Sequence, residues 1–202
     1  MRDWHAFWTR GETPWDRGSA APPLLELMER GHGDFLKDAR VLVPGCGSGH
    51  DVRALAAAGA RPVGLDLSPK AVEVAQGASA NGERYEVGDF LDGSRSGYDA
   101  LWEHTCFCAI EPRLRDDYAR AAAQAVKPGG RLLAVFYLDP DNDGEGPPFG
   151  ATKAEVGSRF GRWFEEIEAY TPKRAYPGRE GREWVFVGER NSEEVAHGPA
   201  EG

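Results

Sequence analysis

The sequence predicts an α/β protein built on a mostly parallel sheet, and two observations support this prediction. Short runs rich in apolar and β-branched residues alternate along the chain with helical segments, as expected for strands joined by crossover helices. The segments after the first two of these runs also begin with helix-start signals, a glycine-rich turn and the pair Ser68-Pro69. A sheet covered by helices on both faces follows from this alternation.

Seven strands are expected, at residues 40–43, 62–66, 84–87, 98–104, 131–138, 162–170 and 183–189. The run at 131–138 is almost wholly apolar, so this strand should be central and buried on both faces. The last two strands are expected to form an antiparallel pair. Helices are expected at residues 50–58, after Ser68, at 112–126 and in a short segment that ends at residue 160. The order predicts a Rossmann-like fold.

Length and composition indicate a small globular protein. With 202 residues, we expect one domain over residues 1–190, with an N-terminal lid and helix in residues 1–35 and a frayed tail at 191–202. The net charge of −9 argues against nucleic acid as a partner, because phosphate contacts need clustered Lys and Arg. No apolar run resembles a signal peptide or a membrane span. We therefore expect a cytoplasmic protein, a monomer or small homo-oligomer, that acts on a small molecule.

The strongest functional signal is a glycine-rich turn after the first strand, residues 43–49 (VPGCGSG). Glycine tolerates positive φ and lets the backbone approach a ligand, so Gly45, Gly47 and Gly49 suit a sharp turn beneath a bound molecule. The spacing is G-x-G-x-G, which differs from the G-x-G-x-x-G of dinucleotide pyrophosphate sites. The turn therefore favours a nucleoside-like ligand that carries no phosphate.

Two further strand ends supply matching chemistry. Ligands of doubly wound sheets bind at the carboxyl ends of strands, where Asp66 ends the second strand and Asp89 and Phe90 follow the third. The Asp66 carboxylate can accept hydrogen bonds from both ribose hydroxyls, while Asp89 and Phe90 would offer adenine a polar edge and an aromatic face. Together these residues predict S-adenosyl-L-methionine as the ligand. The alternatives are that Asp66 only caps the following helix of another nucleotide-binding domain, and that Asp89 only forms a turn.

Three tryptophans, Trp4, Trp8 and Trp15, precede the first strand. Trp4 and Trp8 are four positions apart and would share one face of a short helix, with Phe7 beside them. An amphipathic helix anchored in the core would explain this spacing. An aromatic lid would also explain it, because aromatic rings exclude water and attract a sulfonium cation.

The N-terminal pattern W-x3-W-x2-G-x-T-P-W-D-x-G, residues 4–18, resembles the thiopurine S-methyltransferase family, especially its plant thiol and halide methyltransferase branch. The resemblance continues at residues 43–51 (VPGCGSGHD) and 63–66 (VGLD), and returns at 107–112 (FCAIEP) and 146–149 (GPPF). These blocks lie in order over about residues 4–189.

The resemblance implies a class I methyltransferase that uses S-adenosylmethionine. Carried over position by position, it assigns donor contacts to Trp4, Trp8, Trp15, Gly45, Asp66, Asp89 and Phe90. Gly47 belongs to the same turn as Gly45, and the position of His104 contacts donor or acceptor in the family. The pair Glu103-His104 replaces an Asp-Arg or Asp-Tyr pair of relatives, so the roles of these two residues stay open.

Candidate acceptor residues lie near the ends of the fourth and fifth strands. His104 is the candidate for an acid–base or anion-binding role because histidine titrates near neutrality, and a structural histidine is the alternative. Phe7, Tyr137 and Phe149 are candidates for the wall of the acceptor pocket. The acidic loop at 139–150 is expected to be solvated, and no metal site is expected.

The cysteines Cys46, Cys106 and Cys108 form an odd set whose spacing does not suggest disulfides. Because Cys46 follows the first strand and the other two follow the fourth, all three could converge and bind a soft metalloid. The alternative is that they only pack, since free cysteine is among the most buried residue types.

Methyl transfer from a sulfonium is an in-line displacement, for which a protein mainly aligns the reactants and excludes water. A thiolate, sulfide, thiocyanate or halide needs little help from a general base, and the sequence offers few bases. The hypothesis is therefore a methyltransferase for a small soft nucleophile. The alternatives are a methyltransferase for another small-molecule heteroatom, such as that of a natural product, and a non-catalytic S-adenosylmethionine-binding protein.

Overall fold

The structure is a computed structural model that describes residues 2–140, 142 and 144–192. Within these residues, seven strands form one sheet in the order β3-β2-β1-β4-β5-β7-β6. The strands are β1 (Arg40–Pro44), β2 (Arg61–Asp66), β3 (Arg84–Val87), β4 (Tyr98–His104), β5 (Val126–Tyr137), β6 (Phe164–Tyr170) and β7 (Glu183–Arg190). The first five strands pair in parallel, whereas β7 is antiparallel to both of its neighbours. The predicted Rossmann-like sheet with an antiparallel C-terminal strand is confirmed.

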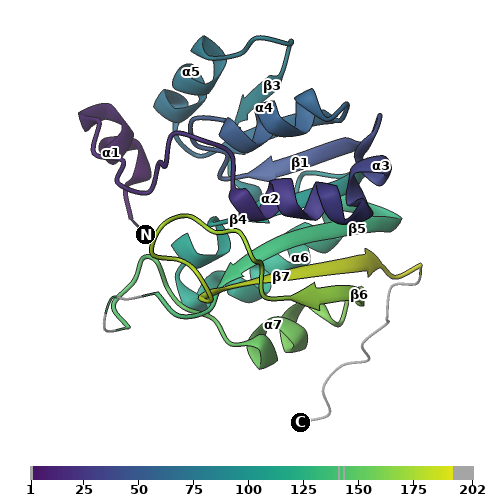
Figure 1. Cartoon of the computed structure of the whole chain (residues 1–202). Helices are drawn as coiled ribbons and strands as arrows, with labels where there is room; N and C mark the ends of the chain where they lie inside the picture. The colour runs from purple at the N-terminus through teal and green to yellow at the C-terminus, as the bar shows by residue number, and fades with distance from the viewer. Residues whose placement is uncertain (1, 141, 143, 193–202) are drawn as a thin grey trace.

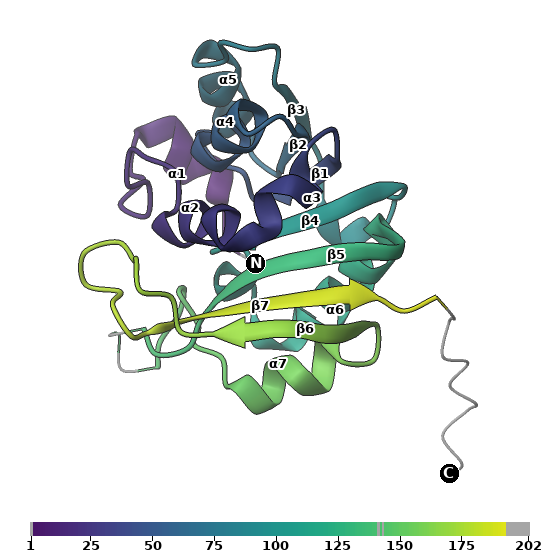
Figure 2. The same ribbon diagram turned by 45° about the vertical axis from the view of Figure 1, so that its right-hand side comes forward.

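Helices cover both faces of this sheet (Figure 1, Figure 2). The helices are α1 (Trp4–Arg10), α2 (Pro22–Leu27), α3 (Gly33–Leu36), α4 (His50–Ala57), α5 (Pro69–Gly77), α6 (Arg115–Ala125) and α7 (Lys153–Phe160), with a π-helical turn η1 (Met28–His32) and 3₁₀ turns η2 (Phe90–Asp92), η3 (Phe107–Ala109) and η4 (Pro112–Leu114). Successive strand residues point to opposite faces. In β5, Leu132 and Phe136 accordingly pack with α6 and α7, whereas Leu133 and Val135 join the core beneath α2, α4 and α5.

The predicted helix at 112–126 differs from the observed one. The chain first forms η4, then α6, and Val126 is already extended and begins β5. Pro128 disfavours helical backbone at Lys127, so the helix has to end before the Lys-Pro pair. The strand expected to begin at residue 131 consequently starts at Val126. Most of the expected tail, residues 193–202, lies outside the described residues.

The first helix is capped at both ends and is attached to the start of α5 by a side-chain contact. The side chain of Asp3 accepts a hydrogen bond from the Ala6 N–H, and Gly11 ends α1 in a left-handed conformation. His5 of α1 reaches the hydroxyl of Ser68, with 3.1 Å between Nδ1 and Oγ. Because Ser68 also caps α5 by accepting from the Ala71 N–H, α1 is attached to the start of α5.

Candidate active site

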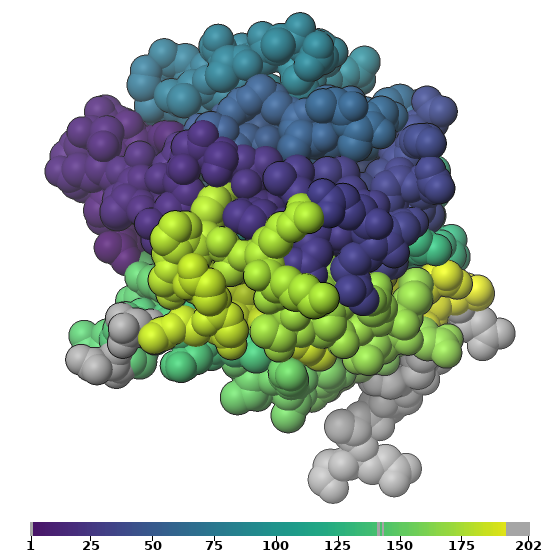
Figure 3. Space-filling view, viewed as in Figure 1, coloured from purple at the N-terminus to yellow at the C-terminus, as the bar shows by residue number. Residues whose placement is uncertain are grey.

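A cavity of about 740 Å³ opens at the carboxyl ends of the parallel strands. Its wall comes from the turn after β1, the ends of β2, β3 and β5, the segment after β4, α1 with residues 14–17, the loop before α7 and the loop between β6 and β7. In Figure 1 these covering segments lie at one end of the sheet, and in Figure 3 the purple N-terminal segment adjoins the yellow-green segment between β6 and β7. The volume falls within the range of ~300–1,000 Å³ that small-molecule sites occupy.

The glycine turn forms the floor of this cavity. Gly45 and Gly47 have φ values of +61° and +52° and both line it. A Cβ atom on Gly45 would lie 2.9 Å from the Sγ of Cys106, so a larger residue does not fit. A Cβ atom on Gly47 would lie 3.3 Å from the Trp8 ring. The turn therefore presents bare backbone to the cavity, with α1 directly above it.

The Asp66 carboxylate organises this turn. One oxygen accepts from the Gly47 N–H at 3.0 Å, and the other accepts from the Ser68 N–H at 2.9 Å. The side chain lines the cavity although the residue is only 8% exposed, and burial raises its pKa despite these two hydrogen bonds. The helix-start contact considered from the sequence is thus present, and lone pairs of the same carboxylate remain for a ligand.

The end of β3 contributes less aromatic surface than expected. Asp89 lines the cavity and accepts from the Leu91 N–H at 2.9 Å, which starts η2. Phe90 also lines the cavity, but it is buried in the core with its ring centroid 4.8 Å from that of Tyr118. Leu67, which is 44% exposed, offers the cavity an apolar side chain beside Asp66 that sequence reasoning missed.

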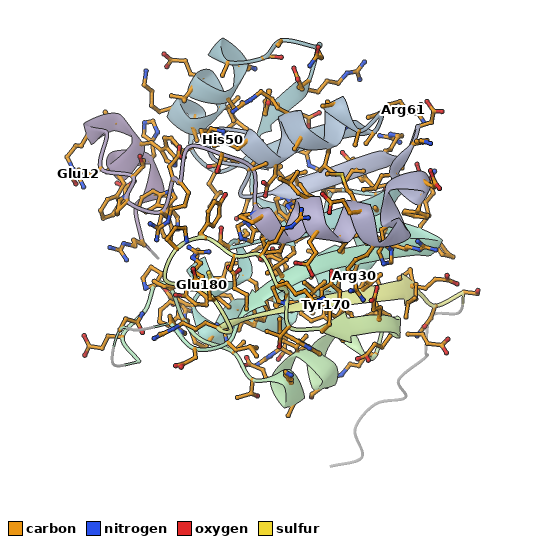
Figure 4. The ribbon with its side chains drawn as sticks, viewed as in Figure 1. Glu12, Arg30, His50, Arg61, Tyr170 and Glu180 are labelled. Atoms are coloured by element: carbon orange, nitrogen blue, oxygen red, sulfur yellow. The ribbon has the colours of Figure 1, made fainter. Side chains whose placement is uncertain are left out.

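The aromatic residues of the N-terminal segment gather into one cluster, which we call the lid. The lid consists of Trp4, Phe7, Trp8 and Trp15. The centroid of the Trp15 ring lies 5.2 Å from that of Trp4, 5.8 Å from that of Phe7 and 6.3 Å from that of Trp8. All four line the cavity. The lid is also tied to α4, because the ring nitrogen Nε2 of His50 (Figure 4) lies 3.2 Å from Asp16 Oδ1.

The far side of the cavity contains Tyr137, Phe149 and a buried arginine, Arg179. The guanidinium carbon of Arg179 lies 4.8 Å from the centroid of the Tyr137 ring, and the residue is 7% exposed. Its Nη1 donates to Oε1 of Glu183 at 3.2 Å. Sequence reasoning missed Arg179 because its segment, PGREGRE, has the composition of an ordinary charged surface loop.

His104 lies outside this cavity and faces a small adjoining hollow of about 80 Å³. Its Nδ1 is 3.5 Å from Oδ2 of Asp51, and its Nε2 is 3.7 Å from Oε1 of Glu183. Burial by itself lowers the pKa of His104, but the two flanking carboxylates outweigh it and raise the pKa to about 9. The structure therefore brings together every predicted site residue except His104, which lies behind the cavity wall.

The three cysteines do not converge. Cys46 packs with the core beneath α2, α4 and α5, whereas Cys106 packs with the core on the opposite face of the sheet. Cys106 and the buried Cys108 both line the large cavity, and Cys46 does not. Burial raises the pKa of all three thiols, that of Cys108 to about 12. Side-by-side thiolates for a soft metalloid are thus not formed, and among the described residues no group of three His, Cys, Asp or Glu side chains is arranged to hold a metal ion.

A sequence profile described as Thiopurine S-methyltransferase matches residues 1–189. The chain belongs to the thiopurine S-methyltransferase family. The resemblance seen in the sequence blocks is confirmed, and so is the expected methyl donor, S-adenosyl-L-methionine, on which this family of enzymes depends.

Named relatives of this family member include plant enzymes. Thiocyanate methyltransferase 1 of Brassica oleracea is 36% identical over 152 residues, which cover 72% of this chain and 66% of that protein. Thiocyanate methyltransferase 1 of Arabidopsis thaliana is 33% identical over 189 residues, or 89% of this chain and 81% of the relative. The solved structure of a TehB-like S-adenosylmethionine-dependent methyltransferase from Corynebacterium glutamicum has a TM-score of 0.67 at 18% identity, covering 92% of this chain and 97% of that one. This last likeness shows the fold.

The family member has no helix within its described residues that is long and apolar enough to span a membrane.

Proposed function

We propose that this family member transfers the methyl group of S-adenosylmethionine to a small soft nucleophile, such as a thiol, sulfide, thiocyanate or halide. The plant relatives named thiocyanate methyltransferase support this substrate class. The observation that carries the proposal is the ionic lining of the cavity. A buried cation, Arg179, faces it, while the carboxylates that line it are already engaged.

The engaged carboxylates leave little capacity for general-base chemistry. Asp66 and Asp89 accept backbone N–H groups, and Glu111 pairs with Arg113 at 2.7 Å. Among the described residues that line the cavity there is neither histidine nor lysine. An acceptor that arrives as an anion needs no proton removed in the transition state. Soft anions therefore match the lining better than amines or alcohols do.

On the donor side, we assign the nucleoside to the strand ends and the sulfonium to the lid. Asp66 would accept hydrogen bonds from the ribose hydroxyls, and Leu67 would cover the adenine. The rings of the lid would surround the positive sulfur and exclude water. The residues assigned to the donor are Trp4, Trp8, Trp15, Gly45, Gly47, Asp66, Asp89 and Phe90.

On the acceptor side, we assign Phe7, Tyr137 and Phe149 to the wall and Arg179 as the buried positive charge, in addition to the more exposed Arg2 and Arg17 that also line the cavity. The nucleophile attacks the methyl carbon while the carbon–sulfur bond breaks, and the bonding electron pair stays on the sulfur of adenosylhomocysteine. Alignment of nucleophile, carbon and sulfur within this closed space supplies most of the rate advantage. His104 takes no part in bond making.

The acceptor is proposed to be a small molecule, with no role for nucleic acid, because a net charge of −9 repels a phosphate backbone. A cytoplasmic location and a monomeric or small homo-oligomeric state stay predictions from the sequence.

The test is methyl transfer from S-adenosylmethionine to thiocyanate, iodide, hydrosulfide and a panel of thiols, with the volatile product measured in the headspace. We expect turnover of at least one of these acceptors. Tight donor binding with no transfer to any of them would refute the proposal. Turnover of a natural-product heteroatom would then favour the second class of acceptor, and no turnover at all would favour a non-catalytic donor-binding protein.

A further inference from the structure

Four alternating charges connect α4 to the acceptor side of the cavity. They are Asp51, His104, Glu183 and Arg179, and we call them the buried charge chain. His104 lies between the carboxylates of Asp51 (3.5 Å) and Glu183 (3.7 Å), and Glu183 accepts from Arg179 at 3.2 Å. Of the four residues, Arg179 alone also lines the large cavity.

The two carboxylates are supported unequally. Asp51 accepts from the Ala21 N–H at 2.7 Å and from the indole N–H of Trp102 at 2.8 Å. Glu183 is 1% exposed, and its Oε2 has no hydrogen-bond partner among the residues that the structure describes. A buried carboxylate with so few donors depends on nearby positive charge. His104 and Arg179 are the cations that the described part of the chain places beside it.

The charge state of His104 therefore determines how positive the electrostatic potential is in front of Arg179. With a cationic His104, the two positive and two negative charges of the chain balance. With a neutral His104 the chain would carry a net charge of −1, and Glu183 would offset the guanidinium without help. The potential that an acceptor experiences in front of Arg179 would then be lower, because such interactions are strong where water is excluded.

We propose that His104 is a positioning residue for the acceptor. Its positive charge neutralises the carboxylate of Glu183, so that the electrostatic potential of Arg179 in the cavity stays positive and favours anions. This inference rests on the proposed function, since it concerns the acceptor of that reaction. It names the property that the acceptor must have, a negative charge on the soft atom or next to it.

Other titratable groups lie near His104, and their loss of protons has to be distinguished from that of His104. Tyr176 of the β6–β7 loop stacks obliquely on the His104 ring, and burial raises its pKa to about 12. On β4, burial raises the pKa of the neighbouring Glu103 to about 7. The pair Asp16 and His50 lines the same small hollow. The pKa of His104 is raised to about 9, between the value of about 7 for Glu103 and the value of about 12 for Tyr176.

The experiment measures thiocyanate binding to the enzyme–adenosylhomocysteine complex by calorimetry between pH 6 and 10. Thiocyanate remains an anion throughout this range. For the unchanged chain we expect an affinity that is flat up to about pH 8 and falls as His104 loses its proton near pH 9. His104→Gln should bind about tenfold more weakly at pH 7 and lose that fall. Because the ligand and the other residues are the same in both proteins, the difference between the two pH profiles measures the contribution of His104.

Charge compensation separates this role from a merely structural one. In the double variant His104→Gln/Glu183→Gln one charge of each sign is removed, so affinity should return to within about threefold of the original. Glu183→Gln alone should bind thiocyanate at least as tightly as the unchanged chain. His32→Gln is the matched control, because this histidine pairs with a carboxylate, Glu168 at 3.0 Å, away from the cavity. It should leave thiocyanate binding unchanged.

The outcomes separate the inference from the proposed function. If thiocyanate binds with the expected profile but is not methylated, the proposed function fails for this acceptor and the role of His104 stands. If thiocyanate is methylated while His104→Gln binds it as tightly as the unchanged chain, or if the double variant stays weak, the role of His104 is wrong. Absence of thiocyanate binding in the unchanged chain also overturns it.

Discussion

At the scale of single residues, buried ionisable groups beside the cavity titrate according to their partners. Burial raises the pKa of Glu103 to about 7, because its hydrogen bonds with the Tyr118 hydroxyl and the Phe107 N–H do not replace the lost hydration. Burial pushes the pKa of Asp51 in the same direction, but the adjacent His104 and the N–H donors lower it overall. The partners of these two carboxylates thus shift their pKa values in opposite directions.

Glu103 gives a testable pH dependence of stability. Because its pKa is higher in the folded than in the unfolded state, the folded state binds more protons between about pH 4.5 and 7, and stability falls as pH rises through this range. The size is about 3 kcal/mol, from ~1.4 kcal/mol per pKa unit. In Glu103→Gln this decrease should be absent. Urea unfolding of both proteins at pH 5 and 7.5 measures it, and equal slopes with pH would contradict it.

At the scale of secondary-structure elements, two of the segments that close the cavity, the lid and the loop before α7, belong to neither face of the sheet. The lid is supported by the glycine turn below Trp8 and by Ser68 at the start of α5. The loop before α7 is anchored by the Phe149 N–H, which donates to the Cys108 carbonyl at 2.7 Å, and by Arg115. By contrast, Arg30 and Tyr170 (Figure 4) join η1 to β6 through a cation–π contact of 4.0 Å, away from the cavity.

Replacing Trp8 should loosen the lid. Trp8→Ala removes the buried ring that lies over Gly47, so we expect donor affinity to fall at least tenfold and donor release to become faster. Calorimetry with adenosylhomocysteine and stopped-flow fluorescence measure the two effects. Trp163→Ala is the matched control, because Trp163 is partly buried under Arg190 and does not line the cavity. Equal donor affinities of the two variants would argue against the lid.

Replacing Arg115 should disturb the acceptor side alone. Arg115 is buried and donates to the carbonyls of Phe149 and Gly150 at 2.9 and 3.0 Å. In Arg115→Met we expect the acceptor KM to rise several-fold while the donor Kd stays within twofold. Arg159→Met is the control. Both arginines pair with Glu155, Arg115 at 2.9 Å and Arg159 at 3.2 Å, but only Arg115 donates to these carbonyls among the described residues. A change in donor Kd as large as that in acceptor KM would contradict the division into two sides.

At the scale of the whole molecule, the site lies where the strand order changes direction. The chain runs outward from β1 to β2 and β3, then returns to β4 and β5 on the other side of β1. The loops after β1 and β4 therefore run in opposite directions from the end of the sheet and leave a crevice between them, in which a ligand can bind. This arrangement places the glycine turn and the segment after β4 on the wall of one cavity.

Donor binding should stabilise the entire fold. Because adenosylhomocysteine would bind only the folded state, 100 times its Kd should stabilise the protein by ~2.7 kcal/mol, whereas NAD at the same concentration should leave the Tm unchanged. Differential scanning fluorimetry with both ligands measures this. Stabilisation by NAD and not by adenosylhomocysteine would instead indicate a dinucleotide site and would refute the donor assignment.

Local signals in the sequence were sufficient for the donor side of the site. The positions of Gly45, Gly47 and Asp66 follow from one strand–turn–helix unit and the strand next to it, where spacing along the chain dictates geometry. The Ser68 cap and the seven strands are local features of the same kind. The helix before Pro128 ends one residue earlier than expected, at Ala125, and the following strand starts at Val126 instead of residue 131, because proline restricts the residue before it.

The acceptor side depended on contacts between distant segments. Arg179 reaches the cavity because the loop before β7 folds over the sheet, and His104 turns away from it toward carboxylates from α4 and β7. Cys46 and Cys106 follow neighbouring strands but pack on opposite faces.

The sequence by itself therefore determined the glycine turn, the donor and the family, because these are encoded in short segments with fixed spacing. Only the tertiary structure decided which charged side chains line the cavity. That choice depends on how loops far apart in the chain pack together, and on the free energy of burying charges in balanced pairs.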